Sequence, residues 1–364
     1  MRILRGYILK ELLQPSAMAL LLFTFVMLVG NLVKLADLLV NKGISPLDIL
    51  QLFGLLIPSL LIYTVPMALL TGTLLAFGKL SSDREILAMK ASGIGLFPIA
   101  LPVLIVGLLV SLAMVPINAE AVPWSHFVAR QLGVKVVTEN PTAFLEPGRF
   151  IKEFKPYILF IYQINGNQMS KVRIYEPRED GPTRTIVAER GEFLPVPDEN
   201  RVVLKLYDGA ADEPDPKIPS KFYKLEFQTY AMNLRLKGGQ DPRTLDKKPK
   251  DMSLQELRDE VHRLALQGID PAPLEMELHR RIAMAFSPLV FILIGLPLGI
   301  TTRRAQRSIG LGISVLIFVG YYLLLIGGQA LGQKGWLPPG PALWLANGVM
   351  GTVGGILLWR AARS

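Results

Sequence analysis

The sequence contains no cysteine and only three histidines among its 364 residues. Without cysteine the chain has no disulfide, no thiolate nucleophile and no cysteine-ligated metal. Cysteine usage therefore does not indicate whether the protein works in an oxidising or a reducing compartment. The histidines, His126, His262 and His279, form no H-x-x-x-H or H-E-x-x-H pattern, which disfavours a metal site. We therefore expect no catalytic residue and no metal ligand in this chain.

An ATP-binding loop is also missing. The nearest approach is GTLLAFGKL (72–80), which has five residues between its glycines and Leu80 where Ser or Thr must hold Mg²⁺. We therefore expect no cofactor in this chain. Any active transport would take its energy from another polypeptide or from an ion gradient.

Long apolar runs dominate both ends of a sequence that is 51% hydrophobic. A helix needs roughly 20 apolar residues to cross a bilayer, and six segments qualify: about 15–33, 54–78, 96–116, 282–300, 309–331 and 342–359. Their cores contain no Asp, Glu, His or Lys, which disfavours coupling to a proton or sodium gradient. The sequence thus predicts three spans within 1–116 and three within 281–364.

The charges divide between these regions. Residues 117–280 hold 24 Lys and Arg against 25 Asp and Glu, so the formal net charge of +9 belongs to the hydrophobic flanks. Nucleic-acid binding would need a basic face on a folded domain, which this distribution disfavours. Eleven Lys and Arg lie in the termini and short connections of one side and three on the other, which predicts cytoplasmic termini and an extracytoplasmic insert, 117–280.

The insert reads as a β domain. Short alternating runs are separated by Gly, Pro, Asn and Asp, as in an all-β sandwich: 150–154, 158–164, 171–177, 184–189, 201–207 and 221–230. Residues 253–280 turn helical, with Ser253 and Glu256 fitting a capping box. We predict a membrane α-helical fold of six transmembrane helices, three plus three, with an inserted all-β, jellyroll-like domain and a helical return segment.

Two shorter segments also suggest helices. In residues 1–14 apolar Leu4, Ile8 and Leu12 recur every four positions near basic residues, which predicts an interfacial helix before the first span. Residues 82–93, between spans two and three, begin with a possible Ser82–Glu85 capping box and end at Gly93, a suitable C′ residue. An ordinary loop helix in which Glu85 only caps its own end would look the same.

Three stretches make the chain resemble the LptF/LptG family of lipopolysaccharide export permeases, and a fourth, GLLIPSLLIYTVPMALLTGTLLAFGKL (54–80), resembles the LptF branch more than the LptG branch. The three are VPMALLTGTLLAFGKLSSDREILAMKASGI (65–94), PWSHF (123–127) and ELHRRIAMAFSPLVFILIGLPLGI (277–300). The resemblance covers essentially the whole chain. It implies an inner-membrane permease that pairs with an LptG-like homologue, sits on an LptB-like ATPase dimer that binds the ATP and Mg²⁺, and passes lipopolysaccharide to LptC-like and LptA-like periplasmic proteins.

The resemblance also implies roles for particular residues. Residues 82–93 would be the coupling helix, in which Glu85 pairs with a basic residue of the ATPase and Ile86, Met89 and Gly93 shape the fit. Spans one and five would form lateral gates, and the insert would be a periplasmic β-jellyroll that carries lipid.

Basic residues near the outer membrane surface would meet the phosphates of the cargo. Lys34 matches a basic position of the family at the outer end of span one, and Arg130 and Arg149 are weaker candidates; Lys34 could equally extend to the interface as span-end lysines do. Two other functions fit the same sequence: a permease for lipoprotein or another lipid, and a membrane scaffold whose β domain only binds partners.

Overall fold

The computed structural model describes residues 2–40, 45–139, 147–151, 154, 156–165, 168–178, 181–196, 201–214, 222–235, 245–301 and 307–363. They form two compact units. The helical unit comprises residues 1–32, 55–127 and 247–364, and the β unit comprises 33–54 and 128–246.

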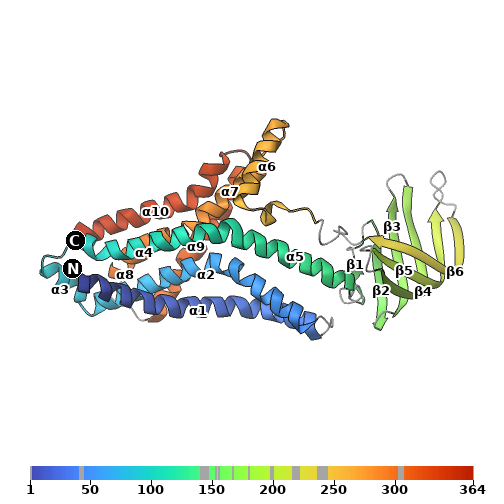
Figure 1. Ribbon diagram of the computed structural model, residues 1–364, viewed down its shortest axis with the longest axis horizontal. Coiled ribbons are helices and arrows are strands. Elements are labelled where there is room, and N and C mark those ends of the chain that lie inside the picture. The colour runs from blue at the N-terminus through green and yellow to red at the C-terminus, as the bar shows by residue number, and fades with distance from the viewer. Residues whose placement is uncertain are drawn as a thin grey trace. The chain divides into compact units, whose positions relative to one another are not determined.

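Helices precede and follow the strands along the chain (Figure 1). The first group is α1 (Arg2–Val40), α2 (Pro46–Ser82), α3 (Glu85–Ala91), α4 (Leu96–Pro116) and α5 (Val122–Glu139). The second group is α6 (Leu254–Leu266), α7 (Ala272–Ala285), α8 (Ser287–Thr301), α9 (Arg307–Gln333) and α10 (Pro339–Arg363).

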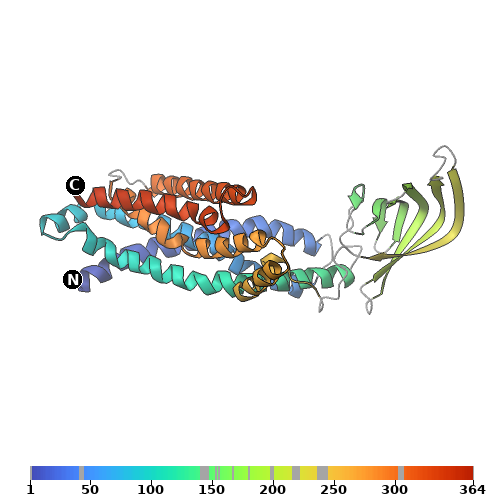
Figure 2. The same ribbon diagram turned by 90° about the horizontal axis from the view of Figure 1, so that it is seen from above.

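The membrane-spanning helices agree with the predicted three-plus-three pattern. Among the described residues, five helices are long and apolar enough to cross a bilayer, one of them α4 in its continuation through α5. The pair α7 and α8, bent by 42° at their junction, makes a sixth when counted as one span. The chain ends lie together at one end of the helical unit, as an even number of crossings requires (Figures 1 and 2). The predicted fold class, a membrane α-helical protein with an inserted β domain, is confirmed.

The helix of the third span extends beyond its predicted end at residue 116. It passes through a π-helical turn, Ile117–Ala121, directly into α5. Asn118 lies in this turn and is buried, and its side-chain amide donates to the Met114 carbonyl at 2.9 Å. A polar side chain satisfied within its own helix gives no reason for the helix to stop. The first residues of the predicted β insert are therefore helical.

The N-terminal apolar stripe lies inside the helical unit. α1 continues from Arg2 through Pro15 without a break, and Ile8 and Leu12 are fully buried. They pack in one cluster with Phe77 and Leu80 of α2. The stripe that predicted a helix on the membrane surface thus packs against neighbouring helices.

Two apolar clusters hold the helical unit together. One joins α1, α2, α3, α4 and α8 around Phe77, Ile99 and Leu296. The other joins α2, α5, α7, α8, α9 and α10 around Phe291, Tyr321 and Leu343. Where α9 crosses α10, a Cβ added at Gly328 would lie 2.1 Å from the Ala342 carbonyl oxygen. The absence of a side chain at Gly328 is what lets these two backbones approach.

The described part of the β unit forms one antiparallel sheet of six strands in chain order (Figure 1). The strands are β1 (Phe150–Ile151), β2 (Ile158–Asn165), β3 (Gln168–Arg178), β4 (Gly181–Val196), β5 (Arg201–Pro214) and β6 (Phe222–Arg235). This meander follows the predicted runs, and β2 to β6 are longer than the sequence pattern suggested. Its buried face includes Leu159, Val172, Ile186 and Leu204, which are fully inaccessible.

Two residues in the long strands have a left-handed backbone conformation, and at these residues the alternation of inward and outward side chains changes. Lys171 and Asp208 have φ of 55° and 51°, which is unusual for residues with a side chain. Met169 and Val172, on either side of Lys171, are both buried, so the alternation of the strand reverses at this residue. The same face therefore stays inward along the whole strand, and one sheet can enclose its own apolar core.

Candidate functional sites in the helical unit

The first candidate site is α3, the short helix between α2 and α4. Its C-terminal end is a complete Schellman motif. Gly93 has φ of 82° and donates its N–H to the Lys90 carbonyl, while the N–H of Ile94 donates to the Met89 carbonyl. Gly93 is thus the C′ residue, as predicted.

The predicted capping box at the start of α3 is wrong. The helix begins at Glu85, its N-cap is Arg84 in the left-handed conformation at φ 60°, and no side chain caps it. Ser82 belongs to the last turn of α2, where its hydroxyl donates to the Lys79 carbonyl at 3.0 Å. The left-handed turn at Arg84 separates the two helices and leaves Glu85 available for other contacts.

Contacts from the first and last helices hold α3 in place. The Tyr7 hydroxyl of α1 donates to both carboxylate oxygens of Glu85, at 3.0 and 2.9 Å. The Lys90 ammonium donates to the Ala361 carbonyl at the end of α10. Neither partner is near α3 in the sequence, and no sequence pattern indicated them. The two ends of the chain therefore fix the position of this seven-residue helix.

The four predicted coupling residues face different surroundings. Ile86 is 4% exposed and packs in the apolar cluster of the helical unit, so its side chain points inward. Met89 is half-buried against the same cluster, whereas Gly93 is exposed with open space at its Cβ position. Leu87, which the sequence reasoning did not single out as a site residue, is 64% exposed. Leu87 is thus the large apolar side chain that α3 leaves accessible.

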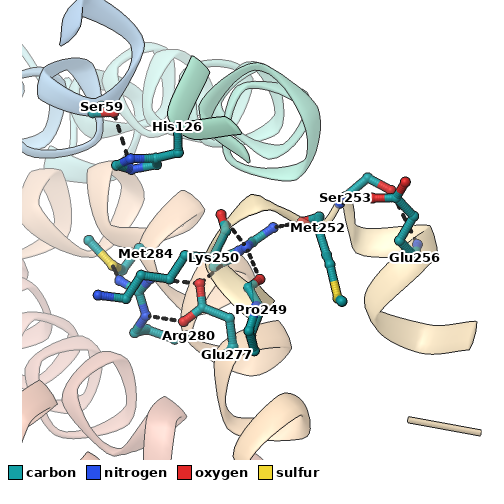
Figure 3. Close-up of polar contacts among 11 residues, drawn as sticks. Ser59, His126, Pro249, Lys250, Met252, Ser253, Glu256, Glu277, Arg280 and Met284 are labelled. Atoms are coloured by element: carbon teal, nitrogen blue, oxygen red, sulfur yellow. Dashed lines mark hydrogen bonds and ion pairs between the residues drawn. The ribbon is translucent and has the colours of Figure 1, made fainter. Parts of the chain in front are cut away.

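The second candidate site is a polar cluster on α7, at the end of the helical unit opposite the chain ends (Figures 1 and 3). Arg281 is 5% exposed in its side chain and donates to the carbonyls of Pro249, Lys250 and Met252 at 2.9, 3.1 and 2.5 Å. Its Nε also donates to Glu277 at 2.9 Å. This arginine fastens the segment that returns from the β sheet onto α7.

The returning segment has further contacts of its own. Ser253 and Glu256 form the predicted capping box at the start of α6, with bonds of 3.2 and 2.8 Å. A bond from Lys247 and the cap together hold the pKa of the Glu256 carboxyl below its usual range. Nearby, the Ser59 hydroxyl of α2 lies 3.4 Å from His126 Nε2 of α5. Several helices thus meet at this end of the unit.

The predicted phosphate contacts belong to the β unit. Arg130 lies in α5 and donates to the Asp246 carbonyl at 2.5 Å, so part of its donor capacity holds the backbone. Arg149 lies exposed directly before β1. Lys34 lies in the last turns of α1, and its side chain is outside the described residues.

Comparison with known proteins bears on the whole chain. Residues 6–360 match the family described as lipopolysaccharide export system permease LptF/LptG. The lipopolysaccharide export system permease protein LptF of Escherichia coli K12 is 24% identical over 344 residues, which cover 94% of this chain and 90% of that protein. The LptF protein of Shigella flexneri matches to the same extent. An uncharacterized protein of Rickettsia prowazekii is 26% identical over 185 residues, about half of each chain.

Proposed function

Because the chain belongs to the LptF/LptG family of lipopolysaccharide export permeases, we propose that it is a non-catalytic permease subunit of an ATP-driven transporter. It extracts lipopolysaccharide from the outer leaflet of the inner membrane and passes it to a periplasmic bridge. Its partners are an LptG-like permease, an LptB-like ATPase dimer that holds the ATP and Mg²⁺, and LptC-like and LptA-like proteins. The β unit is periplasmic and both termini are cytoplasmic, as the distribution of Lys and Arg favours.

One observation carries this proposal: a short helix, α3, projects an exposed leucine from the end of the helical unit that holds both chain ends. A helix that receives movement from an ATPase needs an accessible apolar contact and a firm attachment to the spans. Leu87 supplies the contact, and the buried Ile86 with the Tyr7 and Lys90 bonds supplies the attachment. In this proposal Glu85, Leu87, Met89 and Gly93 face the ATPase, and Ile86 transmits its movement.

The burial of the spans supports an intermolecular role for the first and fifth. Only 17% of the most apolar window of α1 and of α9 is buried within the chain, against 39% for α2 and α4. Exposed apolar side chains on these helices need lipid or another helix as a neighbour. We assign α1 and α9 to the lateral gates and to the contact with the second permease.

The test of coupling is co-purification of the ATPase subunit with the full-length permease pair. Leu87→Asp and Glu85→Arg are expected to reduce recovery of the ATPase by roughly 10-fold or more, because each puts a charge where an apolar or acidic contact is needed. Glu260→Arg on α6 is the matched control, since Glu260 is also in a helix and bonded to one partner, Arg263. Full recovery of the ATPase with both α3 variants would rule out α3 as the coupling element.

The cargo is tested separately. Photocrosslinkers at Lys34, Arg130 and Arg149 are expected to label lipopolysaccharide during ATP turnover, because cations near the outer interface attract its phosphates. A reconstituted complex should also hydrolyse ATP faster with lipopolysaccharide than without it. If no adduct forms and the ATPase activity responds only to another lipid, lipopolysaccharide is not the cargo and that other lipid is.

A further inference from the structure

A small cavity lies between the ends of α7, α9 and α10 in the helical unit, near the α7 polar cluster. Its volume is about 320 Å³, at the low end of the range of small-molecule sites. The polar side chains on its wall are those of Asp270, Glu277, Arg280, Gln329 and Gln333. A mainly apolar bundle thus contains a pocket with charged and amide groups.

Two adjacent arginines of α7 differ in how many of their N–H donors have strong acceptors. Arg281 spends its donors on three carbonyls and on Glu277. Arg280 donates from Nε and Nη2 to Glu277, at 2.9 and 2.8 Å, and its Nη1 donates to the sulfur of Met284 at 3.4 Å (Figure 3).

A thioether is a weak acceptor, and no oxygen acceptor for Arg280 Nη1 lies among the described residues. The side chain of Arg280 is 27% exposed, so a ligand in the cavity has access to it. Arg281 therefore stabilises the fold, whereas the Nη1 donor of Arg280 is available to a ligand.

The cavity lies at the depth where spans end. α9 finishes at Gln333, and the turn to α10 exposes 71% of Trp336, with the Lys334 ammonium 5.3 Å from the centre of its ring. Tryptophan and lysine at the end of a span are typical of the headgroup layer. A polar cavity at this level is within reach of lipid headgroups.

The charges on the wall restrict the ligand. Asp270 and Glu277 are matched in number by Arg280 and by Arg281, which is bonded to Glu277, so a headgroup that carries only negative charge gains no net attraction here. A headgroup with both a phosphate and an ammonium satisfies both signs. We propose that this cavity binds the headgroup of an aminophospholipid of the bilayer, with its phosphate on Arg280 and the two glutamine amides and its ammonium toward Asp270 and Glu277.

The lipid bound here is a resident of the bilayer and differs from the transported cargo. The site requires only that this end of the helical unit lies in the headgroup layer, and it would exist whatever the cargo is. Binding of phospholipid can therefore fail or succeed independently of lipopolysaccharide export.

The test is native mass spectrometry of the full-length permease complex, stripped of lipid and titrated in turn with phosphatidylethanolamine, phosphatidylglycerol and lipopolysaccharide. Phosphatidylethanolamine is expected to bind roughly 10-fold more tightly than phosphatidylglycerol. Arg280→Gln should weaken phosphatidylethanolamine by roughly 10-fold or more. Glu277 keeps its bond to Arg281 in this variant, so the polar cluster still has its second ion pair.

A second variant guards against misfolding of the first. Ala272→Phe, at the cavity wall, fills the space from the first turn of α7 and should abolish the tight phosphatidylethanolamine binding without touching any ion pair. Arg263→Gln is the matched control, because Arg263 also pairs with a glutamate three residues earlier but lies outside the cavity. Three results would each overturn the proposal. The two phospholipids could bind equally, neither cavity variant could change phosphatidylethanolamine binding, or the variants could weaken only the binding of lipopolysaccharide.

Discussion

Replacing Arg281 by methionine should release the segment that returns from the β sheet while leaving the membrane helices folded. The side chain is 5% exposed and makes three bonds to backbone carbonyls and one to Glu277. Hydrogen bonds to a charged group contribute about 1.5–3 kcal/mol each when no compensation follows. Water can hydrate the freed carbonyls once the segment separates from α7. We therefore expect the free energy of local opening to fall by about 3 kcal/mol in total.

Hydrogen exchange measures this loss directly. A loss of about 3 kcal/mol in the free energy of local opening raises the exchange rate roughly 100-fold. The informative amides are those of Lys248, Asp251 and Glu256, which donate within the segment and its cap. Arg281→Lys keeps a charge for Glu277 but has fewer donors for the carbonyls, so an intermediate rate is expected.

The control for this experiment is Arg263→Met. Arg263 lies on α6 in an exposed pair with Glu260, and water screens such pairs so that they contribute little to stability. Exchange in residues 247–257 should then remain near the wild-type rate. If Arg281→Met also left that rate unchanged while the protein kept its thermal midpoint, the idea that this arginine fastens the segment would be refuted.

Three further predictions concern single contacts. The Glu256 carboxyl has a lowered pKa in the folded chain, so exchange protection at the start of α6 should be full at neutral pH and be lost in acid, as the pH falls through this lowered pKa. Glu256→Gln should remove this dependence on pH. Asn347 joins the Tyr321 hydroxyl to the Ala283 carbonyl, with bonds of 2.9 and 2.7 Å. Asn347→Ala removes both bonds and should destabilise the helical unit by about 1–3 kcal/mol in thermal unfolding, more than Tyr321→Phe, which removes one. Equal effects of the two variants would contradict this. Gly354→Ala should cost about 1–3 kcal/mol because its Cβ would lie 2.9 Å from the backbone of Leu293, whereas Gly351→Ala on the same helix has open space and should be neutral or stabilising.

Sequence reasoning succeeded where the deciding interactions are local or repetitive. The spans follow from runs of apolar residues, and the strands from alternation between turn residues. The cap at Ser253 and the C′ role of Gly93 depend on neighbours within a few positions, and both were correct. The helical stretch 117–139 was missed because its mixed polar residues show neither pattern.

The remaining contacts depend on residues far apart in the chain. Ser82 and Glu85 have the spacing of a capping box, but the left-handed Arg84 assigns Ser82 to the preceding helix. Glu85 binds Tyr7 from the first helix, and Arg281 binds carbonyls about 30 positions earlier. Periodicity contains no information about such pairs, so they emerge only when the helices are packed.

The attachment of α3 has a mechanical consequence. Tyr7 ties it to the first helix and Lys90 ties it to the last, so α3 bridges the beginning and the end of the chain. A push on this seven-residue helix is divided at once between the N-terminal and C-terminal halves, without first travelling along any loop. In the proposed transporter, one movement of the ATPase would then displace both sets of three spans at the same time.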